Sequence, residues 1–380
     1  MLWLSLKMLL HQKIRFIITL LGISISAVLA LVEVAIYLGS MGNASAVISH
    51  TDADIWITSK NIQTSDFALP FPDQRINQVR AYSQVKWARK ILLFWGYLKL
   101  ANGGREQVQI IGYDPDTGTG APWSMIAGSP YNVKGGNYMI LDKTAEQRLG
   151  HLQLGSLWEL DFAGSKRSFK LVGLSEGIKS FTTAPMVFMS YNRLSQFFTQ
   201  IGLRDQTAFI VAKLNNPNDL NSVVAALRAT MKDNDVFTKA GFIRKTIMYW
   251  TVQTGMGMAF FLTAILAMII GGTIVGQTIY ASTLEHIREY GTLKAIGAKN
   301  HEIYQVIFSQ AGISAIAGYL IASLLVLSLQ GWINKAGVPI YLSPMLFFSL
   351  FIVILFACLA SAYFSVGKIR ALDPVTVFKA

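Results

Sequence analysis

Long stretches without a charged side chain dominate the pattern of this 380-residue chain. Residues 246–284, 303–334 and 336–367 contain no Lys, Arg, Asp or Glu. A fourth apolar run, 16–38, contains Glu33 as its one charged residue. The hydrocarbon core of a bilayer is about 30 Å thick, so a helix of about 20 apolar residues can cross it. Each run therefore predicts one membrane-spanning helix.

A secretory signal peptide is the competing interpretation of the first run, with Ala44-Ser45-Ala46 as a cleavage site. The apolar region of a signal peptide is about 7–15 residues long. Because the run 16–38 is 23 residues long, it favours an uncleaved membrane anchor.

The segment between the first two runs has the pattern of a mixed α/β domain. Two apolar-rich runs joined by Asn102-Gly103-Gly104 predict a β-hairpin, and a second pair of runs around Gly164-Ser165 predicts another. The predicted strands are 54–58, 91–100, 107–113, 157–162, 168–174, 186–189 and 207–213, and the predicted helices are 72–84, 191–199 and 218–231.

The distribution of basic residues orients the spanning helices, because cytoplasmic loops carry an excess of Lys and Arg. The short loop near 331–342 holds Lys335 alone. Nine basic residues gather in the N-terminal stub, the loop between the second and third runs, and the C-terminal tail: Lys7, Lys13, Arg15, Arg288, Lys294, Lys299, Lys368, Arg370 and Lys379. We therefore expect a multi-pass protein of the bacterial inner (cytoplasmic) membrane, with both termini in the cytoplasm.

The composition agrees with this assignment. Charged residues make up 14% of the chain, against about a quarter in soluble proteins. The net charge of +12 does not indicate nucleic-acid binding, because the outer segment mixes 23 basic with 16 acidic residues and has no basic stripe. The single cysteine, Cys358, lies in the fourth run, so the outer domain is expected to stand without a disulfide.

These patterns predict an α-helical membrane protein with four transmembrane helices plus a mixed α/β extracytoplasmic domain inserted between helices 1 and 2. The expected parts are a cytoplasmic stub at 1–15, transmembrane helix 1 at 16–39, a periplasmic domain at 40–249, transmembrane helix 2 at 250–283, a cytoplasmic coupling segment at 284–302, transmembrane helix 3 at 303–330, a periplasmic loop at 331–343, transmembrane helix 4 at 344–367 and a cytoplasmic tail at 368–380.

The sequence contains no recognisable catalytic or metal-binding motif. No two of the five histidines have metal-ligand spacing, and no G-x-S-x-G nucleophile motif is present. His286 and His301 are expected to be solvated residues at helix ends, and the acidic stretch 114–120 is expected to be a turn rather than a calcium loop. The stretch GGTIVGQT at 271–278 resembles a phosphate-binding loop, but Gln277 replaces its lysine. We expect no enzyme activity, metal or bound cofactor.

Several residues inside the spans call for an explanation. The Gly272-x3-Gly276 spacing allows two transmembrane helices to approach closely, and Gly312 and Gly318 are expected to pack in the same way. Glu33 is a candidate functional acid, because an ionisable residue within a membrane is functional by default. The competing interpretation places its carboxylate in the water at the outer end of the first helix.

The loop between the second and third runs carries the most specific motif. Its stretch REYGTLKAIGA resembles the R-E-[IY]-G-x-[LM]-[KR]-A-[IV]-G-A signature of FtsX/MacB-type (type VII) ABC transporter permeases. The order of the spans and the large domain after the first span match that family, and the tail KIRALDPVTVF at 368–378 resembles its ending. The stretches 111–123 and 186–198 are most similar to DevC-type exporter permeases.

The resemblance implies that the loop is the docking site of a cytoplasmic ATPase. Leu293 and Ile296 stand three residues apart on one helical face, and Gly297 can end the helix. The residues expected to form this coupling segment are Arg288, Glu289, Tyr290, Gly291, Leu293, Lys294, Ala295, Ile296, Gly297 and Ala298.

The implied function is that of the permease subunit of an ATP-driven exporter for a lipid or another hydrophobic substrate. Two copies of the chain would assemble with two separate ABC ATPase subunits, which bind the ATP and Mg, and with a periplasmic membrane-fusion adaptor and an outer-membrane duct. The expected environment is membrane lipid, with no nucleic acid. The alternatives are an FtsX-like signal transducer that controls a cell-wall hydrolase, and a LolC/LolE-like permease that releases lipoproteins.

Overall fold

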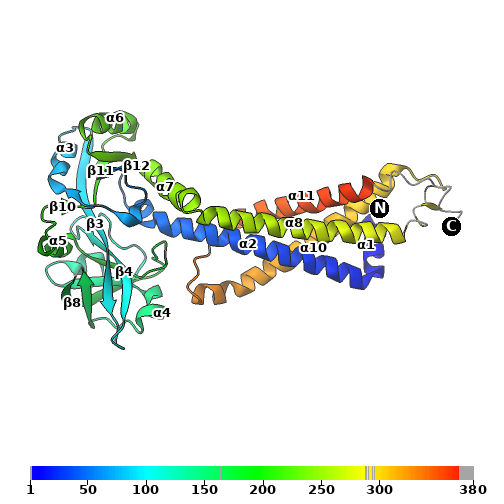
Figure 1. Ribbon diagram of the computed structural model, residues 1–380, viewed down its shortest axis with the longest axis horizontal. Coiled ribbons are helices and arrows are strands. Elements are labelled where there is room, and N and C mark those ends of the chain that lie inside the picture. Colours follow the sequence, from blue (N-terminus) through cyan, green and yellow to red (C-terminus); the bar gives the residue numbers. More distant parts are fainter. Residues whose placement is uncertain are drawn as a thin grey trace. The chain divides into compact units, whose positions relative to one another are not determined.

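The chain, seen in a computed structural model (Figure 1), divides into two compact units, Met1–Gly39 with Met256–Ala380 and Ser40–Gly255. The structure describes residues 2–162, 164–286, 289, 291–292, 294 and 296–367. The first unit contains the apolar helices, and we call it the membrane unit. The second is the inserted domain, and we call it the outer unit.

Four helices of the described residues are long and apolar enough to cross a membrane, as predicted. They are α2 (Lys13–His50, of which residues 13–39 belong to the membrane unit), α8 (Met256–Glu285), α10 (Asn300–Lys335) and α11 (Pro344–Gly367). A shorter helix, α1 (Leu2–His11), precedes α2. The second spanning helix begins at Met256 rather than at 250, because Gly255 has a φ of +72° and residues 249–253 form a separate π-helix.

Small side chains line the contacts between the spanning helices. Buried alanines such as Ala27 on α2 and Ala315 on α10 belong to one continuous apolar cluster of the membrane unit. Polar side chains join the helices through backbone carbonyls: the Ser24 hydroxyl donates to the Gly318 carbonyl at 3.0 Å, and the Tyr319 hydroxyl donates to the Phe347 carbonyl at 2.6 Å. Hydrogen bonds of this kind stabilise helix association in lipid, where apolar contact alone gives little driving force.

Ten strands of the described residues form the main sheet of the outer unit, in the order β12-β1-β11-β3-β4-β9-β6-β8-β5 with β7 pairing β3 and β8. The main-sheet strands are β1 (Ile55–Ser59), β3 (Val85–Lys99), β4 (Arg105–Tyr113), β5 (Met125–Ala127), β6 (Tyr138–Asp142), β7 (Leu157–Phe162), β8 (Ser165–Ser175), β9 (Met186–Ser190), β11 (Phe209–Leu214) and β12 (Asn234–Thr238). A two-stranded sheet pairs β2 (Phe71–Pro72) with β10 (Gln206–Thr207). The helices are α3 (Ile76–Arg80), α4 (Glu146–Leu149), α5 (Tyr191–Gln200), α6 (Leu220–Thr230) and α7 (Lys239–Met248).

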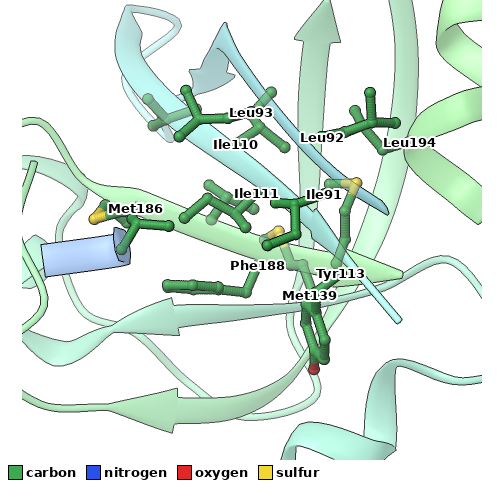
Figure 2. Close-up of a cluster of buried hydrophobic side chains, with 14 of the residues drawn as sticks. Ile91, Leu92, Leu93, Ile110, Ile111, Tyr113, Met139, Met186, Phe188 and Leu194 are labelled. Carbon is green, nitrogen blue, oxygen red and sulfur yellow. The ribbon is translucent and has the colours of Figure 1, made fainter. Parts of the chain in front are cut away.

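Two hydrophobic cores pack against the main sheet. On β1, Trp56 points into the larger core, whereas Ile55 and Ile57 point into a smaller core that includes Leu227 of α6. This alternation follows from the two-residue period of a strand. Figure 2 shows the larger core, where side chains of β3, β4, β6 and β9 meet, among them Phe188.

A buried acid lies in the loop between β1 and β2. Asp66 is 6% exposed and accepts hydrogen bonds from the Gln109 amide (3.2 Å), the Trp250 indole (3.1 Å) and the Thr64 hydroxyl (3.3 Å). Its backbone carbonyl accepts a further bond from the Trp95 indole at 2.9 Å. Asp66 thus connects β3, β4 and the π-helix at 249–253, where Trp250 stands, with neutral donors only.

The structure corrects several predicted elements of the outer unit. The expected helix at 72–84 shrinks to α3 and a 3-10 turn at Asp73–Arg75, and β3 begins at Val85 instead of 91. The start of β3 pairs with β11. It was not predicted as a strand because Lys86, Arg89 and Lys90 interrupt the apolar pattern there. The predicted strand 207–213 is divided between β10 and β11. The sequence pattern does not predict β2, β5, β6, β12, α4 or α7.

Gly318 and Gly312 both lie on α10, but only one of them is closely packed. A Cβ at Gly318 would lie 2.7 Å from Cγ2 of Ile23, whereas a Cβ at Gly312 would meet nothing within 4 Å. The expectation that Gly312 packs against a neighbouring helix is therefore wrong for the described residues. We expect Gly318→Leu to lower the free energy of unfolding by about 1–3 kcal/mol through overpacking, as measured by thermal unfolding in detergent. Gly312→Leu is the matched control, and equal destabilisation by both changes would contradict the packing account.

Candidate coupling site

The coupling segment, 284–302, begins in the last turn of α8, which ends at Glu285. Of the residues predicted to dock the ATPase, Arg288, Tyr290, Leu293 and Ala295 lie outside the described residues. The tail at 368–378 lies outside them too. The other predicted docking residues are described: Glu289, Gly291, Lys294, Ile296, Gly297 and Ala298.

The described residues expose both a charged and an apolar side chain. The Glu289 side chain is 64% exposed and Ile296 is 80% exposed, whereas Gly291 is buried. The Gly297 amide donates to the Lys294 carbonyl at 3.0 Å, and Gly297 has a φ of +106°. A glycine tolerates this conformation where L side chains are strained. Gly297 therefore allows the chain to turn before α10 begins at Asn300.

A network of polar side chains joins the start of α2 to the end of α8. The Arg15 guanidinium donates to both carboxylate oxygens of Glu285, at 2.7 Å and 2.5 Å. Gln12, in the break between α1 and α2, accepts from Arg15 at 3.0 Å and donates to Glu285 at 2.8 Å. The pair of parallel Arg–carboxylate bonds fixes both position and orientation. The N-terminal end of α2 is thereby held to the last turn of α8.

His286 extends this network into the coupling segment. Its Nε2 lies 3.1 Å from the Gln12 Nε2, and its Nδ1 lies 2.7 Å from a carboxylate oxygen of Glu289. Because the Gln12 amide nitrogen is a donor, His286 accepts at Nε2 and donates from Nδ1 to Glu289. A continuous series of hydrogen bonds therefore runs from α2 to the second residue of the REYG motif.

Most of this network is not predicted by the sequence pattern. Gln12 and Glu285 belong to no recognised motif, and the position of Arg15 indicates only the orientation of the helices. The expectation that His286 is a solvated helix-end residue is wrong, because His286 is 8% exposed and both of its ring nitrogens have partners. The available signal was the position of Arg15 and Glu285 at the ends of two predicted spans on the same side of the membrane.

The glycines predicted to pack helices face different neighbours. A Cβ at Gly272 would lie 3.1 Å from the Ser361 hydroxyl of α11. Gly272, Gly276 and Gln277 line an open groove of about 650 Å³ between α8 and α11. Another glycine of α8, Gly271, packs against α2: an added Cβ there would lie 2.7 Å from Cβ of Ser26.

Glu33 lies on α2 and is partly exposed. The Ala35 carbonyl, two residues later, accepts a hydrogen bond from the Tyr341 amide at 3.0 Å, so Glu33 stands within one turn of the loop between α10 and α11. Within the described ranges, no Lys or Arg nitrogen lies within 4.0 Å of its carboxylate. A functional role for Glu33 stays a prediction.

Four apolar helices, a β-rich domain inserted after the first of them, and a short charged segment between the second and third define a class of membrane permease. Two family models match the chain: the FtsX-like permease C-terminal model matches residues 261–374, and the MacB-like periplasmic core domain model matches residues 16–230. The second match covers more than half of the 380 residues. The chain belongs to the FtsX/MacB-type permeases of ABC transporters, which are multi-pass membrane proteins.

Individual relatives share parts of the chain. The macrolide export ATP-binding/permease protein MacB of Acinetobacter baylyi is 28% identical over 153 residues, which are 40% of this chain and 23% of that protein. The chain thus aligns with about a quarter of the length of this relative. The periplasmic region of MacB from Actinobacillus actinomycetemcomitans aligns with a TM-score of 0.38 and 14% identity, covering 52% of this chain and 93% of that one. The extracellular domain of the noncanonic ABC-type transporter YknZ from Gram-positive bacteria aligns with a TM-score of 0.34 and 12% sequence identity. This alignment covers 49% of this chain and 98% of the YknZ domain.

Proposed function

We propose that the chain is the permease subunit of an ATP-driven exporter, and that a separate ABC ATPase docks on its coupling segment at 284–302. Both termini and this segment face the cytoplasm, since nine basic residues gather there against Lys335 in the α10–α11 loop. The outer unit faces the periplasm. ATP and Mg are bound by the ATPase, and the chain acts by changing conformation.

One observation supports this proposal above the others. A permease that is driven by a docked ATPase needs a mechanical link between the docking site and its spanning helices. The bonds from Arg15 through Glu285, Gln12 and His286 to Glu289 form such a link. A displacement of Glu289 by a bound ATPase would be transmitted to both α2 and α8.

Family membership and the small number of spans support the assembly that we propose. Two copies of the chain pair about a two-fold axis, with one ATPase beneath each copy. A periplasmic membrane-fusion adaptor and an outer-membrane duct receive the substrate, which we propose is a lipid or another hydrophobic molecule handled at the periplasmic side. The MacB relative is named for macrolide export, and a hydrophobic cargo is consistent with that name.

Disrupting the docking surface is expected to release the ATPase. Glu289→Lys combined with Leu293→Asp reverses the exposed charge of Glu289 and replaces an apolar residue of the docking motif with a charged one. We expect the amount of ATPase that co-purifies with the full chain in mild detergent to fall at least about tenfold, as for loss of a central interface contact. Mass spectrometry of the bound proteins would measure this loss and would also identify an adaptor.

The matched control is Glu176→Lys, which makes the same charge change at an exposed acid of the outer unit. It is expected to retain the ATPase. Undiminished ATPase on the Glu289→Lys/Leu293→Asp chain would overturn the docking proposal. Recovery of a coiled-coil hydrolase in place of an adaptor would favour the signalling alternative.

A further inference from the structure

The corner between α1 and α2 contains a cavity whose lining includes Gln12, Arg15 and Glu285 of the mechanical link, but to which the proposed function assigns no ligand. Its volume is about 600 Å³, and its lining includes His11, Lys13, Ile14, Ile18 and Glu285. This volume is within the range of small-ligand sites, about 300–1,000 Å³. The cavity combines basic groups with aliphatic side chains, a mixture that suits an amphipathic anion.

The basic side of the cavity is not neutralised. Arg15 is paired with Glu285, but Lys13 is exposed, and among the described residues no carboxylate oxygen lies within 4.0 Å of its Nζ. Lys7, on α1, also lacks an acidic partner within the described ranges and lies 4.0 Å from the Trp3 ring. The corner therefore carries positive charge that is available to an anion.

The apolar side of the cavity leads along α2. Ile14 is 79% exposed and Ile18 is 55% exposed. Both lie near the start of the apolar run 16–38, where an exposed aliphatic side chain meets lipid tails. A ligand with an anionic head at Lys13 and a hydrocarbon tail beside these isoleucines would satisfy both parts of the site.

Helix α1 places this corner at the membrane surface. One face packs on α10, where the Ser5 hydroxyl donates to the Val306 carbonyl at 3.1 Å. The other face exposes Trp3 (68%), Leu6 (41%) and Leu10 (50%). A helix with an apolar outer face, a tryptophan and a lysine is typical of one that lies in the lipid headgroup region. The connection to α2 two residues later agrees with that position.

We propose that the α1–α2 corner binds an anionic phospholipid, with its phosphate at Lys13 and an acyl chain along Ile14 and Ile18. The leaflet follows from the proposed orientation and is the cytoplasmic one, whereas the binding itself does not depend on an ATPase. Glu285 lines the same cavity and belongs to the network that reaches Glu289. The lipid therefore contacts the link between the docking site and the spanning helices.

The test uses the purified full chain in detergent and native mass spectrometry. Phosphatidylglycerol and phosphatidylcholine with identical acyl chains are titrated separately, and we expect the chain to prefer phosphatidylglycerol. Lys13→Gln is expected to weaken phosphatidylglycerol binding about fivefold, because a basic residue near an anionic lipid surface contributes about 1 kcal/mol. Lys13→Arg keeps the charge and should bind like the unchanged chain. Lys335→Gln, at the end of α10, is the matched control and should have no effect.

Two further measurements separate a lipid from free phosphate. Ile14→Ser with Ile18→Ser is expected to weaken phosphatidylglycerol binding, and inorganic phosphate is not expected to displace the lipid. Displacement by inorganic phosphate, together with no effect of the isoleucine changes, would show that the site takes free phosphate and would overturn the lipid proposal. Equal binding by the Lys13→Gln chain and the unchanged chain, or an equal loss with Lys335→Gln, would overturn it as well. The ATPase co-purification result leaves these outcomes unaffected.

Discussion

Arg15→Glu is expected to lower ATP-driven activity of the assembled transporter by about tenfold, the size of effect seen when a residue that couples two sites is changed. The substitution places a second carboxylate beside Glu285, in place of the guanidinium that donates to it at 2.7 Å and 2.5 Å. The two carboxylates repel each other, so the start of α2 separates from the end of α8. Activity would be measured as ATP hydrolysis by the permease with its co-purified ATPase in proteoliposomes.

The double change Arg15→Glu with Glu285→Arg is the matched control, and it is expected to restore most of the activity. Gln12 can support the exchanged pair, because its amide offers an oxygen and a nitrogen and can turn to present either one. Unchanged activity of the Arg15→Glu chain would show that the network does not transmit motion. A double change as inactive as the single one would assign the loss to the individual side chains rather than to their pairing.

Asp66→Ala is expected to lower the free energy of unfolding of the full chain in detergent by about 2–4 kcal/mol, since three buried donors lose their acceptor. These donors are the Trp250 indole, the Gln109 amide and the Thr64 hydroxyl. The loss should appear in thermal unfolding and in faster hydrogen exchange at Tyr249–Gln253, where Trp250 is held. Slower or unchanged exchange there would contradict the role of Asp66 in holding the π-helix.

The pH dependence of the Asp66→Asn chain tests the charge of the same group. Burial raises the pKa of Asp66 above its usual range, and hydrogen bonds from Gln109, Trp250 and Thr64 oppose this shift in part. A raised pKa in the folded state means that Asp66 favours folding most below its unfolded pKa of about 3.9, and that this contribution is lost as the pH rises through the folded pKa. We therefore expect the stability of the unchanged chain to fall relative to Asp66→Asn as the pH rises from 4 to 8. A constant difference over that range would contradict the desolvation account.

The spanning helices were predictable because charged side chains are excluded from hydrocarbon. A long run with almost no charged residues is therefore typical of a transmembrane helix. The strands of the outer unit were harder to predict from the sequence. Charged residues such as Lys86 and Arg89 lie on β3, so this part of the strand lacks an apolar pattern and is recognised only from its pairing with β11. The coupling segment could be located from its motif and its position between two spans. The network beside it could not be derived, since Arg15 and Glu285 are 270 positions apart and meet only after the helices pack.

The length of β3 has a consequence for how the outer unit unfolds. Its first part pairs with β11, and its second part pairs with β4 and β7. Ala88 belongs to the smaller core and Leu92 to the larger one, so a single strand supplies side chains to both. Neither half of the sheet can lose its pairing without exposing part of the other. We therefore expect the outer unit to unfold in a single cooperative transition, without prior opening of either half of the sheet.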